Sequence, residues 1–185
     1  MIYFTSDLHF GHTNIIKYCN RPFSSVDEMD KTLIRNWNET VRHDDDIYIL
    51  GDFTMLKSGP AKAYLSALNG KKYLIKGNHD IFLEDFGETE GWFGWVKDYE
   101  IIMHGANSII LFHYPIVEWH KLGKGSIHLH GHLHNSKTVA PWDPSKTRAL
   151  NVGVDVRDFR PISLNEVIEQ AYKIPKLKRH GDDED

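Results

Sequence analysis

Short apolar runs alternate with amphipathic stretches through the first half of the chain. Runs rich in strand-forming residues predict buried strands over residues 2–5, 47–50 and 72–76. Between them, apolar residues at three- and four-residue steps and flanking cap residues predict helices over about 26–42 and 59–68. Strand, loop and helix in this repeated order favour a parallel β-α-β arrangement.

The second half of the chain is predicted to be mostly strand and loop. Four apolar runs indicate strands over residues 96–103, 108–112, 126–130 and 148–152. Asn107-Ser108 predicts a tight turn and, with it, an antiparallel hairpin over 96–112. A last helix is expected from Ser163 to Tyr172, with Ser163 and Glu166 as its capping box.

Composition places the chain among soluble globular proteins. The 185 residues are 41% hydrophobic and 26% charged, with no internal repeat or linker, so we expect one domain over residues 1–175. Residues 176–185 are charged and aperiodic and are predicted to form a mobile tail. A net charge of −4 excludes a global positive field that would draw the chain onto nucleic acid or anionic lipid.

The same sequence features bear on the cellular compartment. The first residues have neither the basic segment nor the long apolar core of a signal peptide, and no apolar run approaches the ~20 residues of a membrane helix. Cys19 is the single cysteine, which excludes an internal disulfide and a cysteine-based zinc cluster. We therefore expect a cytoplasmic protein with no membrane partner. The sequence predicts no oligomeric state.

Twelve histidines are the unusual count in the composition. Four of them stand at every second position of one short stretch: His128, His130, His132 and His134. Alternate residues of an extended chain project to one side, so this stretch can present two or more imidazoles together. Imidazole is the commonest metal ligand in proteins, which makes a metal site the first hypothesis. A His-rich patch on a solvated strand is the alternative.

Side chains with a lone pair for a metal follow most of the predicted strands. They are Asp7, His9, Asp52, Asn78, His113, His132 and His134. Ligands of open α/β sheets bind beyond the carboxyl ends of the strands, so these groups converge if the strands share a sheet. Each taken alone is also compatible with a helix cap, a turn or a satisfied polar residue.

Five blocks in order resemble the signature of the calcineurin-like metallophosphoesterases. They are Asp7-Leu-His9, Gly51-Asp52, Gly77-Asn78-His79-Asp80, His113 and Gly131-His-Leu-His134. Met55 stands where the family often has a further aspartate, usually a supporting residue rather than a ligand. The resemblance implies an α/β fold of two facing mixed β-sheets flanked by helices, an αββα sandwich. It places a dimetal site at the carboxyl edge of the strands.

The resemblance also implies two metal ions that share Asp52, each of whose carboxylate oxygens binds one ion. The first ion would take Asp7, His9, Asp52 and His134, and the second Asp52, Asn78, His113 and His132. Four protein ligands leave open positions for water and substrate, as a catalytic site needs. Oxygen and imidazole ligands without thiolate suit Mn²⁺, Fe²⁺, Ni²⁺ or Zn²⁺ better than Mg²⁺, with Mn²⁺ our first choice.

The reaction implied by the resemblance is phosphoester hydrolysis, most simply of a phosphodiester. A metal-bridging hydroxide would be the nucleophile, and His79 would act as general acid towards the leaving oxygen. Asp80 would fix the tautomer of His79, cap the following helix, or do both. A DNA- or RNA-processing nuclease and a broad phosphomonoesterase use the same chemistry, and an inactive metal-binding scaffold is a further alternative.

The substrate itself leaves weaker signals in the sequence. His12, Asn14 and Arg21 follow the first metal block and are expected to contact substrate phosphate, of a nucleotide or nucleic acid among others. Two further segments, Trp119–Lys124 and Trp142–Arg148, either rim the pocket with aromatic and basic side chains or combine packing residues with solvated lysines. Asn151 and Asp155 are assigned a structural role near the site.

Overall fold

Two facing β-sheets form the centre of the computed structural model, which describes residues 1–89, 91–136, 143 and 145–176. Most of the predicted tail and Trp142 lie outside these residues. The first sheet runs β4 (Val96–Lys97), β3 (Lys71–Ile75), β2 (Asp46–Leu50), β1 (Ile2–Thr5) and β9 (Ile162–Ser163). The second runs β5 (Tyr99–His104), β6 (Asn107–Phe112), β7 (Ile127–His130) and β8 (Ala149–Asn151).

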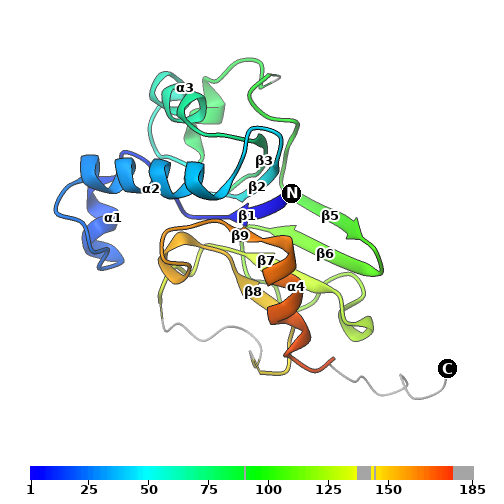
Figure 1. Ribbon diagram of the computed structural model, residues 1–185. Helices are drawn as coiled ribbons and strands as arrows, with labels where there is room; N and C mark the ends of the chain where they lie inside the picture. The colour runs from blue at the N-terminus through cyan, green and yellow to red at the C-terminus, as the bar shows by residue number, and fades with distance from the viewer. Residues whose placement is uncertain (90, 137–142, 144, 177–185) are drawn as a thin grey trace, which may run out of the picture.

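Helices flank the two sheets, so the predicted fold class is confirmed (Figure 1). The helices are α1 (Thr13–Tyr18), α2 (Val26–Thr40), α3 (Ser58–Ala67) and α4 (Leu164–Tyr172), with short 3₁₀ helices η1 (Ile81–Glu84), η2 (Leu122–Lys124) and η3 (Val154–Val156). Helix α4 starts with the predicted capping box of Ser163 and Glu166. Both sheets mix parallel and antiparallel pairs, since β9 and β5 each run against their neighbours.

The central strands are apolar on both faces because each face meets a different layer. Ile47 and Ile49 of β2 pack with Leu33 of α2 on the outer side of the first sheet. Leu50 of the same strand points the other way and packs with Leu129 of the second sheet. Burial on both faces explains why this strand reads as a continuous apolar run rather than an alternating one.

Helix α4 and the segment around η2 cover the other surfaces of the two sheets. Helix α4 contacts β1, β8 and β9 and sends Val167 into the core between the sheets. On the outer face of the second sheet, Ile110 packs against Trp119 and Leu122. In the described residues this outer layer is therefore the segment around η2 rather than a long helix.

Two details of the sequence prediction are wrong. The hairpin turn lies at Gly105-Ala106, where Gly105 has φ +57°, and Asn107-Ser108 instead begins β6. The apolar run over 96–103 is split, because β4 joins the first sheet and β5 joins the second. Periodicity alone does not indicate where a chain crosses from one sheet to the other.

The carboxyl ends of the strands from both sheets meet at one edge of the molecule. Strands β1, β2 and β3 are parallel, and so are β6, β7 and β8. Just beyond the strand ends, a parallel bridge joins Ser6 after β1 to Gly153 after β8. This bridge ties the two sheets together where the candidate ligands follow the strands.

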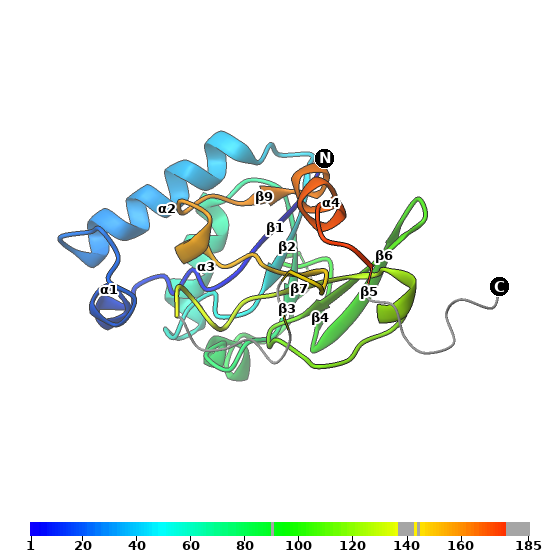
Figure 2. The same ribbon diagram turned by 90° about the horizontal axis from the view of Figure 1, so that it is seen from below.

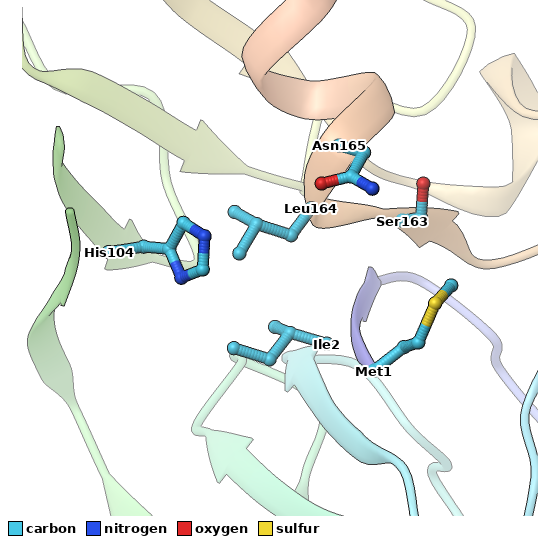
Figure 3. Close-up of a pocket in the computed structure, with 6 residues that line it drawn as sticks. All are labelled: Met1, Ile2, His104, Ser163, Leu164 and Asn165. Carbon is cyan, nitrogen blue, oxygen red and sulfur yellow. The ribbon is translucent and has the colours of Figure 1, made fainter.

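The start of β1 and of α4 borders a separate cavity of about 320 Å³. Figure 3 shows His104 and Leu164 among the side chains that line it, with Ile2 below them. Its described lining brings no carboxylate, thiol or second imidazole beside His104, so we do not assign it to the site. No helix in the described ranges has the length and apolar character to span a membrane.

Candidate metal centre

Two groups of metal-binding side chains lie at the carboxyl edge of the sheets. Potential ligand atoms of Asp7, His9 and His134 lie within 4.8 Å of one another, and so do those of Asp52, His113 and His132. Asn78 joins the second group, with its Oδ1 3.0 Å from His113 Nε2 and 3.2 Å from His132 Nδ1. All seven predicted ligands are thus gathered in two groups of the predicted membership.

Asp52 lies between the two groups. Its Oδ2 is 3.4 Å from His9 Nε2 of the first group and 3.6 Å from His113 Nε2 of the second. Its Oδ1 instead accepts a hydrogen bond of 2.9 Å from the backbone N–H of His79. Of the two oxygens of Asp52, Oδ2 is therefore the one that faces a histidine of each group.

The unsatisfied atoms of the site fit a bound cation. His9 is only 1% exposed, and neither of its ring nitrogens has a hydrogen-bond partner in the described part of the chain. His113 donates from Nδ1 to the Leu50 carbonyl at 2.7 Å, so in the neutral ring its Nε2 carries the lone pair that faces Asn78 Oδ1. Buried polar atoms normally have partners, and two facing acceptors favour a cation between them.

Burial sets the charge states in the first group. Burial and the nearby His134 and Arg21 lower the pKa of His9 to about 2, so its ring is neutral, the form that binds metal. Burial raises the pKa of Asp7 to about 7, against the opposing effect of His134. Both oxygens of Asp7 lie 3.0 Å from the backbone N–H of His132. A divalent cation here would favour the ionised carboxylate of Asp7.

Backbone strain concentrates on the same residues. Five of the seven candidate ligands have positive φ values between +50° and +67°: Asp7, His9, Asp52, His132 and His134. Non-glycine residues adopt this conformation uncommonly, and such strain clusters at functional sites. Gly131 lies at the same crowded edge, where a side chain would not fit, because a Cβ there would lie 1.9 Å from Ser6 Oγ. No apolar or polar periodicity in the sequence signals these backbone angles.

His134 is oriented by a buried carboxylate. Its Nδ1 donates to Asp155 Oδ2 at 2.7 Å, which leaves Nε2 for a metal. Burial lowers the pKa of His134, but the hydrogen bonds with Asp155 and Cys19 and the charge of Asp7 outweigh it and raise the pKa to about 10, so a metal ion that binds Nε2 would displace its proton. Asp155 agrees with its predicted structural role.

Arg21 has a different place from the one predicted. It is 4% exposed, and its guanidinium donates to Asp155 at 2.8 and 2.9 Å and to the carbonyls of Asp7 and Leu8 at 2.7 and 3.0 Å. These bonds engage the planar fork that phosphate would need. Arg21 is therefore a positioning residue for Asp155 and for the first metal block, and not a substrate contact as the sequence predicts.

A third cluster of Cys19, His134 and Asp155 also has metal-binding atoms within 4.8 Å of one another. The Arg21 guanidinium already forms an ion pair with Asp155 there, at 2.8 Å. A metal ion in that place would meet this fixed positive charge, so we do not assign a third metal site to it.

The contact between Asp155 and His134 allows a first prediction. We expect Asp155→Asn to lower Mn²⁺ affinity about 10–100-fold, because His134 loses the charged acceptor that fixes its ring. Isothermal titration with Mn²⁺ measures this change, and thermal unfolding checks that the fold is retained. Asp158→Asn, at an exposed position three residues away, is the matched control. Equal affinities of the two variants would contradict the role of Asp155.

Asp80 also differs from both of its predicted roles. Its Oδ2 accepts from the backbone N–H of Asp52 and Gly77 at 3.0 and 2.7 Å, and its Oδ1 accepts from Phe53 N–H at 2.8 Å. Asp80 makes no side-chain cap to η1 and no hydrogen bond to the ring of His79 in the described residues. It instead holds the loop after β2 against the loop after β3, which places Asp52 beside Asn78.

His79 and His12 line the cavity beside the metal-binding groups. This cavity has a volume of about 840 Å³ and is also lined by Asn14, Tyr18 and Met55. The rings of His12 and His79 each lie 5.5 Å from the ring of His9, between centroids. His12, Asn14 and His79 are thus placed where substrate contacts are predicted. Tyr18 is not among the predicted site residues, since a lone tyrosine gives no signal of its own.

The other histidines and basic residues lie away from this cavity. His128 and His130 belong to β7, are buried, and bind main-chain carbonyls, so only His132 and His134 of the alternating stretch reach the site. Trp119 is buried against Ile110 rather than at a pocket rim. The predicted rim residues Lys121, Lys124 and Arg148 line a different cavity near the starts of β6 and β8.

Relatives of the chain come from archaea, phages and bacteria. The chain is 41% identical to the uncharacterized protein MJ1445 of Methanocaldococcus jannaschii, covering 93% of this chain and 92% of the relative. It is 30% identical to the Gene 66 protein of Mycobacterium phage D29, covering 94% and 96%. No protein-family model matches the chain.

A solved structure has the same fold. The crystal structure of AQ665, a protein of unknown function from Aquifex aeolicus, matches with a TM-score of 0.74 and 28% identity, over 92% of this chain and 98% of that one. None of these names states an activity, so a function has to be argued from the site itself.

Proposed function

The chain belongs to the protein family that contains MJ1445 and the Gene 66 protein of phage D29, and we propose that it is a metal-dependent phosphodiesterase of the calcineurin-like type. The observation that carries this proposal is the position of Asp52, whose Oδ2 lies 3.4 Å from His9 and 3.6 Å from His113. A carboxylate between two groups of imidazole and oxygen ligands suits a pair of metal ions.

The residues fit two divalent ions, and Mn²⁺ is the ion we propose. Asp7, His9 and His134 would hold one ion, Asn78, His113 and His132 the other, and Asp52 both. When bound, such ions acidify water and neutralise phosphate charge. The absence of cysteine from either group disfavours a thiolate-selective metal, and the four imidazoles favour Mn²⁺, Fe²⁺, Ni²⁺ or Zn²⁺ over Mg²⁺.

The side chain of His79 would supply a proton, and its fixed backbone would orient the ring. His79 lines the cavity and is fixed at its backbone, because its N–H donates to Asp52 Oδ1 at 2.9 Å. The ring is held beside His9 without being a member of either metal-binding group. We assign it the role of donating a proton to the leaving oxygen, an effect of about 10²–10⁴-fold in general acid catalysis.

The charges around the cavity favour a diester over a monoester. No lysine or arginine is among the described residues that line it, since the guanidinium of Arg21 is directed to Asp155. A phosphomonoester carries a charge of ≈ −1.5 to −2 near neutral pH, whereas a diester carries about −1. Binding a diester therefore needs less positive charge from protein side chains. His12 and Asn14 are the polar groups we assign to the substrate phosphate.

Comparative turnover on three substrates tests this function. With Mn²⁺, we expect the protein to hydrolyse bis-p-nitrophenyl phosphate faster than p-nitrophenyl phosphate, because the described lining of the cavity offers no lysine or arginine for the second monoester charge. Single-stranded DNA is the third substrate, and its rapid cleavage would identify a nuclease with the same chemistry. Faster hydrolysis of the monoester than of the diester would contradict the proposed substrate preference. Absence of turnover with every tested metal would contradict the proposal that the protein is an enzyme.

A further inference from the structure

A second polar cavity lies at the edge of the molecule opposite the candidate metal centre. It has a volume of about 380 Å³ and is lined by residues at the starts of β6 and β8, around η2 and after α4. In Figure 2 the segment after α4 lies on the far side of the molecule from α1, which borders the metal-centre cavity. Along β6, from Asn107 to His113, the separation is roughly 20 Å at ~3.3 Å per residue.

Four cationic side chains surround this cavity, which we call the cationic pocket: Lys121, Lys124, Arg148 and Lys176. No aspartate or glutamate is among its described lining residues, and none of the four forms an ion pair in the described part of the chain. Like charges gathered without a counter-charge repel one another, and the chain as a whole is acidic at −4. The local concentration of positive charge therefore indicates an anionic ligand.

Arg148 is built into the wall of the cationic pocket rather than lying loose on the surface. It is 7% exposed, its Nε donates to the Ile174 carbonyl at 3.0 Å, and its Nη1 donates to the Gly125 carbonyl at 3.2 Å. Its guanidinium carbon lies 4.4 Å from the centre of the Tyr172 ring. Nη2 has no hydrogen bond within the described residues, so its two N–H groups stay available to a ligand.

The positions of the lysines are also constrained. Lys121 has φ +57°, an uncommon conformation for lysine, and directly precedes η2, which contains Lys124. The aliphatic stem of Lys176 lies so close to Gly125 that a Cβ there would be 2.9 Å from its Cγ. Neighbouring polar groups include Asn107, whose Oδ1 accepts from Tyr172 O–H at 2.9 Å and whose amide N–H groups are left as donors.

We propose that the cationic pocket binds an oligophosphate anion, either free or as the phosphate chain of a nucleotide. Four cations match the charges of several linked phosphates better than the charge of a single phosphate. The cavity volume lies within the ~300–1,000 Å³ usual for small-molecule sites. The face of Tyr172 is already taken by Arg148, so a base has no free aromatic ring to stack on within the described lining. The phosphate chain is the part of the ligand that is recognised.

Isothermal titration of the full chain with sodium tripolyphosphate tests the proposal. The titration is done in EDTA, which keeps metal from the candidate metal centre, so the result does not depend on the proposed phosphodiesterase. We expect one site per chain and an affinity that falls with salt. Lys121→Ala with Lys124→Ala should weaken binding about tenfold or more, equal to 1.4 kcal/mol. The matched control, Lys57→Ala with Lys71→Ala, removes two exposed lysines elsewhere and should leave affinity unchanged.

Further titrations separate the sources of the anion. Equal affinity for ATP and tripolyphosphate would identify the phosphate chain as the whole ligand, and tighter ATP binding would identify a nucleotide. Orthophosphate bound as tightly as tripolyphosphate would overturn the proposal. Equal losses of tripolyphosphate affinity in the two double variants would also overturn the proposal. A single-stranded oligonucleotide that binds far more tightly through Lys121 and Lys124 would replace it with a nucleic-acid surface.

Discussion

Asp52→Asn is expected to abolish high-affinity binding of both metal ions and to lower turnover of a diester by about 10³-fold or more. Oδ2 of Asp52 lies 3.4 Å from His9 of one group and 3.6 Å from His113 of the other, and an amide in its place has no negative charge to neutralise two cations. Loss of metal chemistry costs several kcal/mol of transition-state stabilisation, and each 1.36 kcal/mol corresponds to about tenfold in rate. Metal content by mass spectrometry and steady-state turnover measure the two effects.

Asp45→Asn is the matched control for this change. Asp45 is also buried and directly precedes the same strand, β2, whose other end leads to Asp52. We expect it to retain two metal ions and near-normal turnover, even if its stability falls. An Asp52→Asn protein that still bound two ions tightly would show that the bridge is elsewhere, and the assignment of Asp52 would be wrong.

His79→Asn is expected to leave metal content unchanged while lowering turnover about 10²–10⁴-fold on diesters with poor leaving groups. Its ring belongs to neither metal-binding group, yet it lines the cavity 5.5 Å from the ring of His9. A leaving group that departs readily as an anion needs little proton donation, so activated p-nitrophenyl esters should lose much less. The measurement is a series of diesters graded by leaving-group pKa.

The slope of that series separates an acid from a binding residue. Removal of a proton donor makes turnover depend more steeply on leaving-group pKa. Loss of a binding residue lowers the turnover of all substrates equally. His43→Asn, at an exposed position outside the site, controls for general effects of replacing a histidine. An equal loss on good and poor leaving groups would count against the general-acid role.

The strands that carry the site could be predicted because their burial leaves a direct mark on the sequence. Ile47 to Leu50 read as a continuous apolar run, since one face meets the helices and the other meets the second sheet. Donor side chains placed directly after such runs then identify the candidate ligands, because parallel strands end at one edge. The two groups of candidate ligands lie together for that reason.

The supporting contacts could not be predicted in the same way. Asp80 follows Gly77-Asn78-His79, and this spacing suggested a partner for His79, yet its oxygens accept from three backbone N–H groups across two loops. Arg21 and Asp155 are 134 positions apart, and their contact exists only once the chain is folded. Sequence patterns indicate which face a residue occupies, but not which distant partner takes up its hydrogen bonds.

Neither sheet holds a complete set of metal-binding groups. Asp7, His9, Asp52 and Asn78 follow strands of the first sheet, whereas His113, His132 and His134 follow strands of the second. A partly folded chain with only its first sheet assembled would offer three of four ligands to one ion, Asp7, His9 and Asp52, and two of four to the other, Asp52 and Asn78. If the site binds two ions as proposed, tight metal uptake would follow the docking of the two sheets, and a newly made chain would reach that stage without tightly held metal.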